Sequence, residues 1–223
     1  MKQFGKQAFT LIELLVVISI ILIASSIIFI GGTGGDGAKL SSAQRILSGV
    51  AQGARGQAIL KNATTRLIIH NDPAEPEKFR RYVGMVYQDS DSGEWFAATQ
   101  GTYLPDGIFF DATTSSTLSG INWSEESFDL EYPRAQSKSA NEAGDGFYYY
   151  EYRANGTAVH VNSYLVLRAA TPIIPDGEVT ELRVDVNDLN LRTGFIIRRA
   201  GTTTSIVEPA ALPVGVNGTS IPL

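Results

Sequence analysis

The chain has 223 residues, of which 43% are hydrophobic and 18% are charged, and it contains no cysteine. The lack of thiols excludes disulfide scaffolds, thiolate metal sites and cysteine nucleophiles, and two histidines are too few for a histidine-rich metal centre. The formal net charge of −5 argues against a protein built mainly to coat nucleic acid.

The first feature along the chain is an apolar run of 22 residues, 9–30, in which Glu13 is the one ionisable group. As a helix this run would be about 33 Å long, enough to cross the hydrocarbon core of a bilayer. Lys2 and Lys6 precede it without any acidic residue. Because basic flanks resist translocation, we expect the N-terminus to stay cytoplasmic and the rest of the chain to be exported.

Glu13 sets this run apart from an ordinary export signal. A carboxylate inside a membrane helix costs about 2.5–3.5 kcal/mol on insertion scales. Neither a signal peptide cut near residues 24–26 nor an uncut signal anchor provides anything to offset that cost. The run is also longer than the roughly 7–15 apolar residues of a signal peptide. Both alternatives stay open, as does a Glu13 that reaches the membrane interface without a partner.

The string KQA followed by FTLIELLVVISIILI resembles the leader and N-terminal helix of type IV pilins and pseudopilins. The resemblance implies that prepilin peptidase removes residues 1–8 by cutting between Ala8 and Phe9, and that Phe9 is then N-methylated. Ala8 stands where the family usually has glycine. Glu13 takes the acidic fifth position of the mature chain, where its carboxylate can pair with the amine of Phe9 on a neighbouring filament subunit.

Beyond the apolar run, residues 31–37 contain five glycines, so the helix should break there. This segment is either a hinge that lets the outer domain reorient or a plain linker. A second helix is predicted from residue 38, because apolar residues recur every three or four positions on one face. The residues predicted to be buried on that face are Leu40, Ala43, Leu47, Val50, Ala54 and Ala58.

After Asn62 the sequence changes to short β-type runs separated by turn residues. Asn155-Gly156 predicts a hairpin and residues 90–93 predict another turn. Residues 112–145 are interpreted as a long polar insertion or loop, and residues 201–223 as a flexible C-terminal tail. The predicted strands are 65–70, 81–88, 95–99, 107–111, 147–153, 157–161, 164–169, 182–185 and 194–199.

The predicted fold class is therefore α+β. A long N-terminal hydrophobic helix continues after the glycine-rich break into an amphipathic helix that packs on antiparallel β-sheets. The outer domain is expected to span residues 38–200. Its aromatic strand should send Phe147, Tyr149 and Glu151 to one face of a sheet, and Tyr148, Tyr150 and Tyr152 to the other. One of these faces could bind a sugar or an exported partner, or both could simply pack.

Four short segments of this domain resemble the GspH/FimT group of minor pseudopilins and minor pilins: ARGQAILKNATTRLII, YLPDGIFFD, FYYYEYRANGTA and LRTGFIIRR. The resemblance implies a structural subunit of a type II secretion pseudopilus, not an enzyme, and without a cofactor. It implies storage in the inner membrane, with the outer domain periplasmic or extracellular, before entry into the filament. The implied partners are other pilin or pseudopilin subunits, prepilin peptidase, the inner-membrane assembly platform, the lipid bilayer and secreted cargo.

Two other functions stay open on the sequence. The alternative within the family is a minor or major type IV pilin that serves adhesion, motility or DNA uptake. The alternative outside it is a membrane-anchored enzyme or solute-binding protein, although neither a nucleophilic serine motif nor a phosphate-binding loop occurs. No catalytic site is predicted.

Few residues suggest chemistry of their own. Asp89, Asp91 and Glu94 do not have the spacing of a calcium-binding loop, which favours a polar hairpin turn. His70 and His160 are interpreted as surface or edge histidines, and no metal site is predicted.

Three arginines near the C-terminus, Arg192, Arg198 and Arg199, could form a small phosphate-contacting patch. Removal of residues 1–8 takes away Lys2 and Lys6 and changes the net charge from −5 to −7. A chain this acidic repels duplex DNA unless its charges are segregated, so DNA is not an expected partner.

Overall fold

The structure, a computed structural model, describes residues 12, 14–18, 35–123, 127–133, 144–185, 191–206 and 220–221. The chain divides into two compact units, residues 1–35 and 36–223. In the first unit, Ile12 and residues 14–18 are helical. The rest of the predicted apolar helix, residues 31–34 of the glycine-rich segment, and Ala8, Phe9 and Glu13 lie outside the described residues. None of the helices that the described residues form is long and apolar enough to cross a membrane.

The second unit is built on α2 (Asp36–Lys61), which begins two residues before its predicted start, so Asp36 and Gly37 are helical. Its buried side confirms the predicted stripe with one correction: Ala51 is fully buried, whereas Val50 is only partly buried. Both sets of spacings average 3.6 residues, but with about 100° of rotation per residue Ala51 lies nearer the centre of the buried stripe than Val50 does. The buried residues are Leu40, Ala43, Leu47, Ala51, Ala54 and Ala58.

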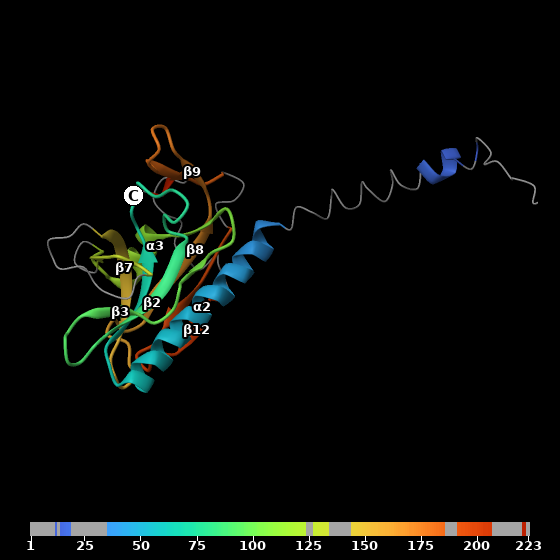
Figure 1. Ribbon diagram of the computed structural model, residues 1–223. Coiled ribbons are helices and arrows are strands. Elements are labelled where there is room, and N and C mark those ends of the chain that lie inside the picture. The colour runs from blue at the N-terminus through green and yellow to red at the C-terminus, as the bar shows by residue number, and fades with distance from the viewer. Residues whose placement is uncertain are drawn as a thin grey trace, which may run out of the picture. The chain divides into compact units, whose positions relative to one another are not determined.

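The largest sheet, whose strands β2, β3 and β7 are labelled in Figure 1, is antiparallel and has the order β3-β2-β1-β7-β6, with β4 also paired to β2. β1 lies in its centre and pairs along its length with both β2 and β7. The central position explains why β1 is almost wholly buried. The strands of this sheet are β1 (Thr65–His70), β2 (Tyr82–Gln88), β3 (Trp95–Ala97), β4 (Thr102–Tyr103), β6 (Ser127–Leu130) and β7 (Asp145–Tyr152).

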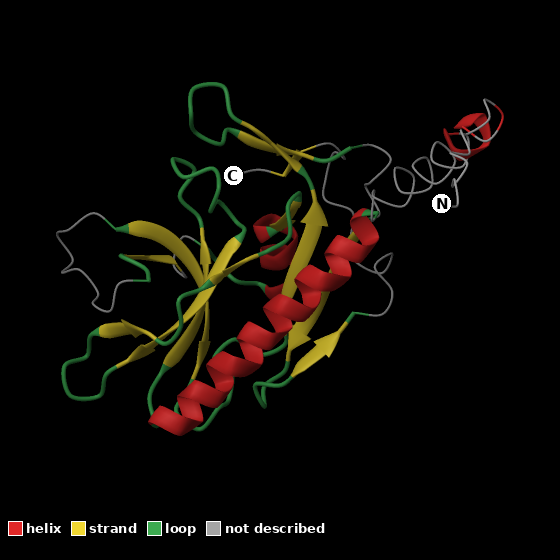
Figure 2. Ribbon diagram, turned by 45° about the vertical axis from the view of Figure 1, so that its right-hand side comes forward, coloured by secondary structure: helices red, strands yellow, loops and turns green. Residues whose placement is uncertain are grey.

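Two smaller sheets complete the domain. One has the order β12-β11-β8-β5 and the other the order β13-β10-β9. The two larger of the three sheets are the one that contains β1 and the one that contains β8. In Figure 2, α2 runs across the strands of these two larger sheets, and it contacts strands of both. The strands of the smaller sheets are β5 (Ile108–Phe110), β8 (Ser163–Ala169), β9 (Thr171–Ile173), β10 (Glu181–Arg183), β11 (Arg192–Ile197), β12 (Thr203–Ser205) and β13 (Ser220–Ile221).

Three predictions about connecting segments are wrong. Residues 112–145 are not simply a polar loop, because they include α3 (Ala112–Ser119), which packs against β8, and also β6. The predicted tail begins with β12, which pairs with β11. Residues 157–161 form no strand: the chain does turn at Asn155-Gly156, but it returns with a single bridge between Tyr152 and Ala158.

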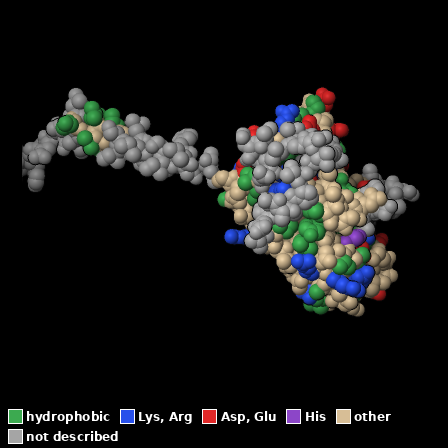
Figure 3. All heavy atoms as spheres, turned by 180° about the vertical axis from the view of Figure 1, so that it is seen from behind, with side chains coloured by type: hydrophobic (Ala, Val, Ile, Leu, Met, Phe, Trp, Pro, Cys, Tyr) green, Lys and Arg blue, Asp and Glu red, His purple; other side chains and the backbone are tan. Residues whose placement is uncertain are grey.

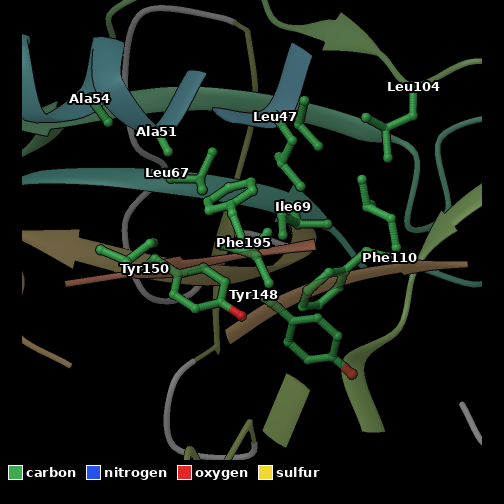
Figure 4. Close-up of a cluster of buried hydrophobic side chains, with 14 of the residues drawn as sticks. Leu47, Ala51, Ala54, Leu67, Ile69, Leu104, Phe110, Tyr148, Tyr150 and Phe195 are labelled. Atoms are coloured by element: carbon green, nitrogen blue, oxygen red, sulfur yellow. The ribbon is translucent and has the colours of Figure 1, made fainter. Parts of the chain in front are cut away.

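The main core lies between α2 and the two larger sheets. Figure 4 shows Leu47 and Ala51 of α2 over Leu67 and Ile69 of β1, with Tyr150 of β7 close by. The predicted alternation along β7 is confirmed, since its tyrosines divide between two clusters. Tyr148, Tyr150 and Tyr152 belong to this core, whereas Phe147 and Tyr149 belong to a cluster on the other face of the sheet. Both faces of the aromatic strand are therefore used in packing.

Candidate functional site

The N-terminal unit presents an apolar helical surface. Ile12 is 71% exposed, and residues 14–18 are between 48% and 61% exposed. Exposed apolar side chains on a helix are stabilised by a membrane or by other helices, not by water. These six residues therefore favour a lipid or protein environment.

In the outer domain, α2 is joined to the sheets by more than apolar packing. Its Gln44 amide donates a hydrogen bond to the carbonyl oxygen of Gly194 in β11, at 2.5 Å. One turn further along, the Ser48 hydroxyl lies 3.0 Å from the Thr203 hydroxyl in β12, and the Gln52 amide donates to the same hydroxyl at 3.1 Å. The helix is consequently tied to two strands through side chains on its flank, which fixes its register against the sheet.

Gly194, in one of the short segments, and Gly201, two residues after the end of the same segment, are required because other backbone atoms approach them closely. A Cβ atom on Gly194, in the TG segment, would lie 2.2 Å from the carbonyl oxygen of Leu165. Gly201 has a φ of +76°, and a Cβ atom there would lie 2.0 Å from the carbonyl oxygen of Gly156 in the hairpin turn. Both positions demand glycine for packing, so both glycines maintain the fold.

The three predicted arginines do not share one surface. Arg192 is only 2% exposed and stands opposite Arg168 in the strand register, whereas Arg198 and Arg199 are exposed. Burial, reinforced by the charge of Arg168, lowers the pKa of Arg192 below its ordinary value. Arg168 itself forms a buried ion pair with Asp111 at 3.1 Å. On the face shown in Figure 3, lysine and arginine side chains form separate small groups and no continuous stripe.

The acidic turn after β2 is a hairpin turn, as predicted. The Asp89 carboxylate accepts hydrogen bonds from the backbone N–H and the hydroxyl of Ser92, both at 2.9 Å. The Asp89 backbone N–H donates to the carbonyl oxygen of Glu94 at 2.8 Å and closes the turn. The hydrogen bonds from Ser92 lower the pKa of Asp89.

His70 is the residue that the sequence interpretation placed wrongly. It is fully buried, because it ends the central strand β1 between β2 and β7. Its Nε2 lies 3.3 Å from Glu75 Oε2 and 3.6 Å from Asp145 Oδ2. Lys78 Nζ lies 2.5 Å from the same Glu75 oxygen and 3.5 Å from Asp145 Oδ2. Burial lowers the pKa of His70, although Asp145 and Glu75 act in the opposite direction.

His70, Glu75 and Asp145 form the one group within the described parts of the chain where three metal-ligating side chains converge. His70 and Glu75 lie five residues apart, a weak signal that the sequence does carry. Asp145 joins them only through the pairing of β1 with β7, which aligns His70 with Phe147.

Comparison with known proteins concerns mainly the N-terminal segment. Residues 4–29 match the family model described as the prokaryotic N-terminal methylation motif, which confirms the predicted prepilin-type motif. No curated protein matches the chain in sequence.

Two solved structures are similar to the chain. The minor pseudopilin EpsH from the type 2 secretion system of Vibrio cholerae is 11% identical with a TM-score of 0.38, over 75% of this chain and 96% of that one. The type IV minor pilin FimU of Pseudomonas aeruginosa is 13% identical with a TM-score of 0.38, over 78% of this chain and 92% of that one. At such low scores, the motif at residues 4–29 is the finding that bears on function.

Proposed function

We propose that the chain is a structural subunit of a pilin-like filament, and specifically a minor pseudopilin of a type II secretion pseudopilus that supports protein secretion. The observation that carries this proposal is the N-terminal methylation motif at residues 4–29, ahead of an α+β domain. The role is mechanical, and no step of it requires a catalytic group or a cofactor.

Maturation would begin on the cytoplasmic side of the inner membrane. Prepilin peptidase cuts between Ala8 and Phe9 and the new N-terminus of Phe9 is methylated. The apolar residues 9–30 then hold the subunit in the bilayer, and the outer domain faces the periplasm or the exterior. The charge of the N-terminal flank supports this orientation, since Lys2 and Lys6 are its only charged residues.

Glu13 would direct assembly. In the filament its carboxylate pairs with the amine of Phe9 on a neighbouring subunit, which fixes one stagger between helices. Removal of one member of a buried ion pair costs about 3–5 kcal/mol, so an unpaired subunit favours transfer from lipid into the filament. The exposed apolar side chains of Ile12 and Leu14, on either side of Glu13 in the sequence, support the need for such a helical environment.

The assembly platform would pull on the N-terminal apolar helix. Because α2 is bound firmly to the sheets, it would transmit that force to the whole outer domain. The hydrogen bonds of Gln44, Ser48 and Gln52 to β11 and β12 support this role. In this proposal the glycine-rich segment 31–37 would act as the hinge rather than as a plain linker, because glycine has few steric limits on its backbone angles.

The choice of a secretion machine rests on the resemblance of four outer-domain segments to the GspH/FimT group, which contains minor pilins as well as minor pseudopilins. The alternative is a minor or major type IV pilin for adhesion, motility or DNA uptake. For DNA uptake, Arg198 and Arg199 are the exposed residues that could contact phosphate, while Arg192 is buried.

The proposal is tested in the source bacterium by deletion of the gene and complementation with the wild-type chain, Glu13→Ala, or Glu94→Ala as the matched control in an exposed turn. We expect deletion and Glu13→Ala to abolish export of secreted enzymes and recovery of the chain in sheared filaments, whereas Glu94→Ala restores both. Normal enzyme export together with loss of twitching or DNA uptake would instead establish the pilus alternative.

A further inference from the structure

The cluster formed by His70, Glu75, Asp145 and Lys78 is not used by the proposed filament function, and it contains a buried histidine without hydrogen bonds. Neither ring nitrogen of His70 has a hydrogen-bond partner, although the side chain has no exposed surface. Glu75 Oε2 is also buried, and its ion pair with Lys78 at 2.5 Å satisfies it in the absence of any other cation. Buried polar groups are nearly always satisfied, so the buried imidazole of His70 calls for a missing partner.

We propose that His70, Glu75 and Asp145 bind a first-row divalent cation, with Zn²⁺ as the reference ion. The ligand atoms are His70 Nε2, Glu75 Oε2 and Asp145 Oδ2, which all lie within 4.8 Å of one another.

Two of the three distances between these atoms agree with tetrahedral coordination. Ligand atoms about 2.0–2.1 Å from a zinc ion and separated by tetrahedral angles lie roughly 3.3–3.4 Å from each other. The observed distances from His70 Nε2 are 3.3 Å to the Glu75 oxygen and 3.6 Å to the Asp145 oxygen. The two carboxylate oxygens lie within 4.8 Å of each other, so the side chains of Glu75 and Asp145 would close on the ion, with water as the fourth ligand.

The backbone holds the three ligands in place. The His70 carbonyl oxygen accepts a hydrogen bond from the Arg80 N–H at 2.8 Å, and the Asn71 N–H donates to the carbonyl oxygen of Gly146 at 2.7 Å. These bonds fix the end of β1 beside the start of β7. The carbonyl oxygen of Glu75 accepts from the N–H of Phe79 at 2.9 Å, within a turn of the β1–β2 connection.

The ligand set favours a transition ion over calcium. Imidazole together with carboxylates suits zinc and its first-row neighbours, whereas calcium takes six to eight oxygen ligands. An ion bound here would join the β1–β2 connection to the start of β7, and it would act as a structural clamp.

Lys78 is the competitor that such an ion must displace. Its ammonium group contacts the ligating oxygens of both Glu75 and Asp145. The side chain is 28% exposed and has a flexible stem, so it can leave the cluster for solvent. Loss of this positive charge should strengthen metal binding, an effect opposite to that of losing a ligand.

The test uses the full chain without a histidine tag, purified in detergent, treated with a chelator and titrated with Zn²⁺ in a calorimeter. We expect the wild type to bind one Zn²⁺ and its Tm to rise by roughly 5–10 °C at a hundredfold excess over Kd. His70→Gln should weaken binding by more than the roughly 10- to 100-fold typical of an outer partner of a metal ligand. Lys78→Met should bind more tightly than the wild type.

His160→Gln is the matched control, because it removes the other histidine of the chain and should leave Zn²⁺ affinity unchanged. Equal affinity in His70→Gln and wild type, or binding that Lys78→Met weakens, would overturn the proposal. So would the absence of binding at millimolar Zn²⁺ in both the wild type and Lys78→Met.

Discussion

Arg66 of β1 and Glu151 of β7 stand directly opposite each other in the sheet register, and their side chains form an ion pair of 2.8 Å. The guanidinium carbon of Arg66 also lies 3.7 Å from the ring centre of Tyr149 and 4.2 Å from that of Trp95. The pair is half-buried on the sheet face opposite to α2. The guanidinium group of Arg66 therefore joins β1 to β7 and organises the aromatic rings around it.

Removal of the Arg66 guanidinium group should destabilise the domain more than the loss of an exposed ion pair would. Arg66→Met should lower the free energy of unfolding by about 1–3 kcal/mol, because it leaves Glu151 partly buried without its partner and removes the stacking on the rings. The stability of Arg66→Lys should lie between that of the wild type and that of Arg66→Met, because lysine keeps the charge but lacks the planar guanidinium group. Urea unfolding of Arg66→Met, Glu151→Gln and the double variant checks this, and strictly additive losses would contradict it.

The close contact of Gly201 with the hairpin predicts a large effect from one methyl group. Gly201→Ala should cost more than about 2 kcal/mol, because the new Cβ would meet the Gly156 carbonyl oxygen in addition to the strain of a positive φ. Gly93→Ala is the matched control, with a φ of +73° but open space around the new atom, and it should cost about 1 kcal/mol. Thermal unfolding compares the two variants. Equal losses would show that Gly201 is not packed against the turn.

The way α2 faces the core predicts that neighbouring positions tolerate a larger side chain to different degrees. Ala51→Leu should lower the free energy of unfolding by about 1–3 kcal/mol, because Ala51 has no exposed surface and faces the core. Val50→Leu should change it by less than about 0.5 kcal/mol, since Val50 is only partly buried. Denaturant unfolding measures both. The reverse order would support the stripe predicted from the sequence.

Two core tyrosines predict loss of stability at alkaline pH. Burial raises the pKa of Tyr150 well above its usual value, and burial also raises the pKa of Tyr152. In the unfolded chain both ionise near pH 10. The unfolded state therefore releases protons first, so their contribution to stability is complete below about pH 10 and is lost as the pH rises further.

The tyrosinate absorbance should thus show some of the nine tyrosines ionising only together with unfolding. Tyr150→Phe should move the alkaline unfolding midpoint to higher pH, although it loses the hydrogen bond to the Tyr164 carbonyl oxygen at 2.8 Å. Tyr103→Phe, at a 46% exposed position, should leave the midpoint unchanged. Early ionisation of all tyrosines without unfolding would contradict this account.

The elements that the sequence predicted well are those in which buried residues recur at one regular spacing, either that of a helix or that of a strand. β1 has the predicted bounds, α2 differs by two residues at its start, and the alternation along β7 is confirmed. α3 was missed because ATTSSTLS has neither an apolar stripe nor good helix formers. It forms because Asp111 caps its N-terminus and because the Ser115 hydroxyl accepts a hydrogen bond from the Val166 N–H at 3.0 Å.

The short strands and the buried histidine depended on tertiary pairing that no local pattern contains. β12 has three residues and gains its stability from β11 and from α2, through Thr203. His70 looked like the end of an edge strand, because the sequence does not tell that β1 has neighbours on both sides. The carboxylate of Asp145 reaches His70 only once β7 has paired with β1.

The central claim, that the chain enters the pilin pathway, is tested most directly by mass spectrometry of its N-terminus after expression with and without prepilin peptidase. We predict a mature chain that begins at N-methylated Phe9 when the peptidase is present, and an uncut leader when it is absent. A cut near residues 24–26, or an uncut leader in the presence of active peptidase, would contradict the account.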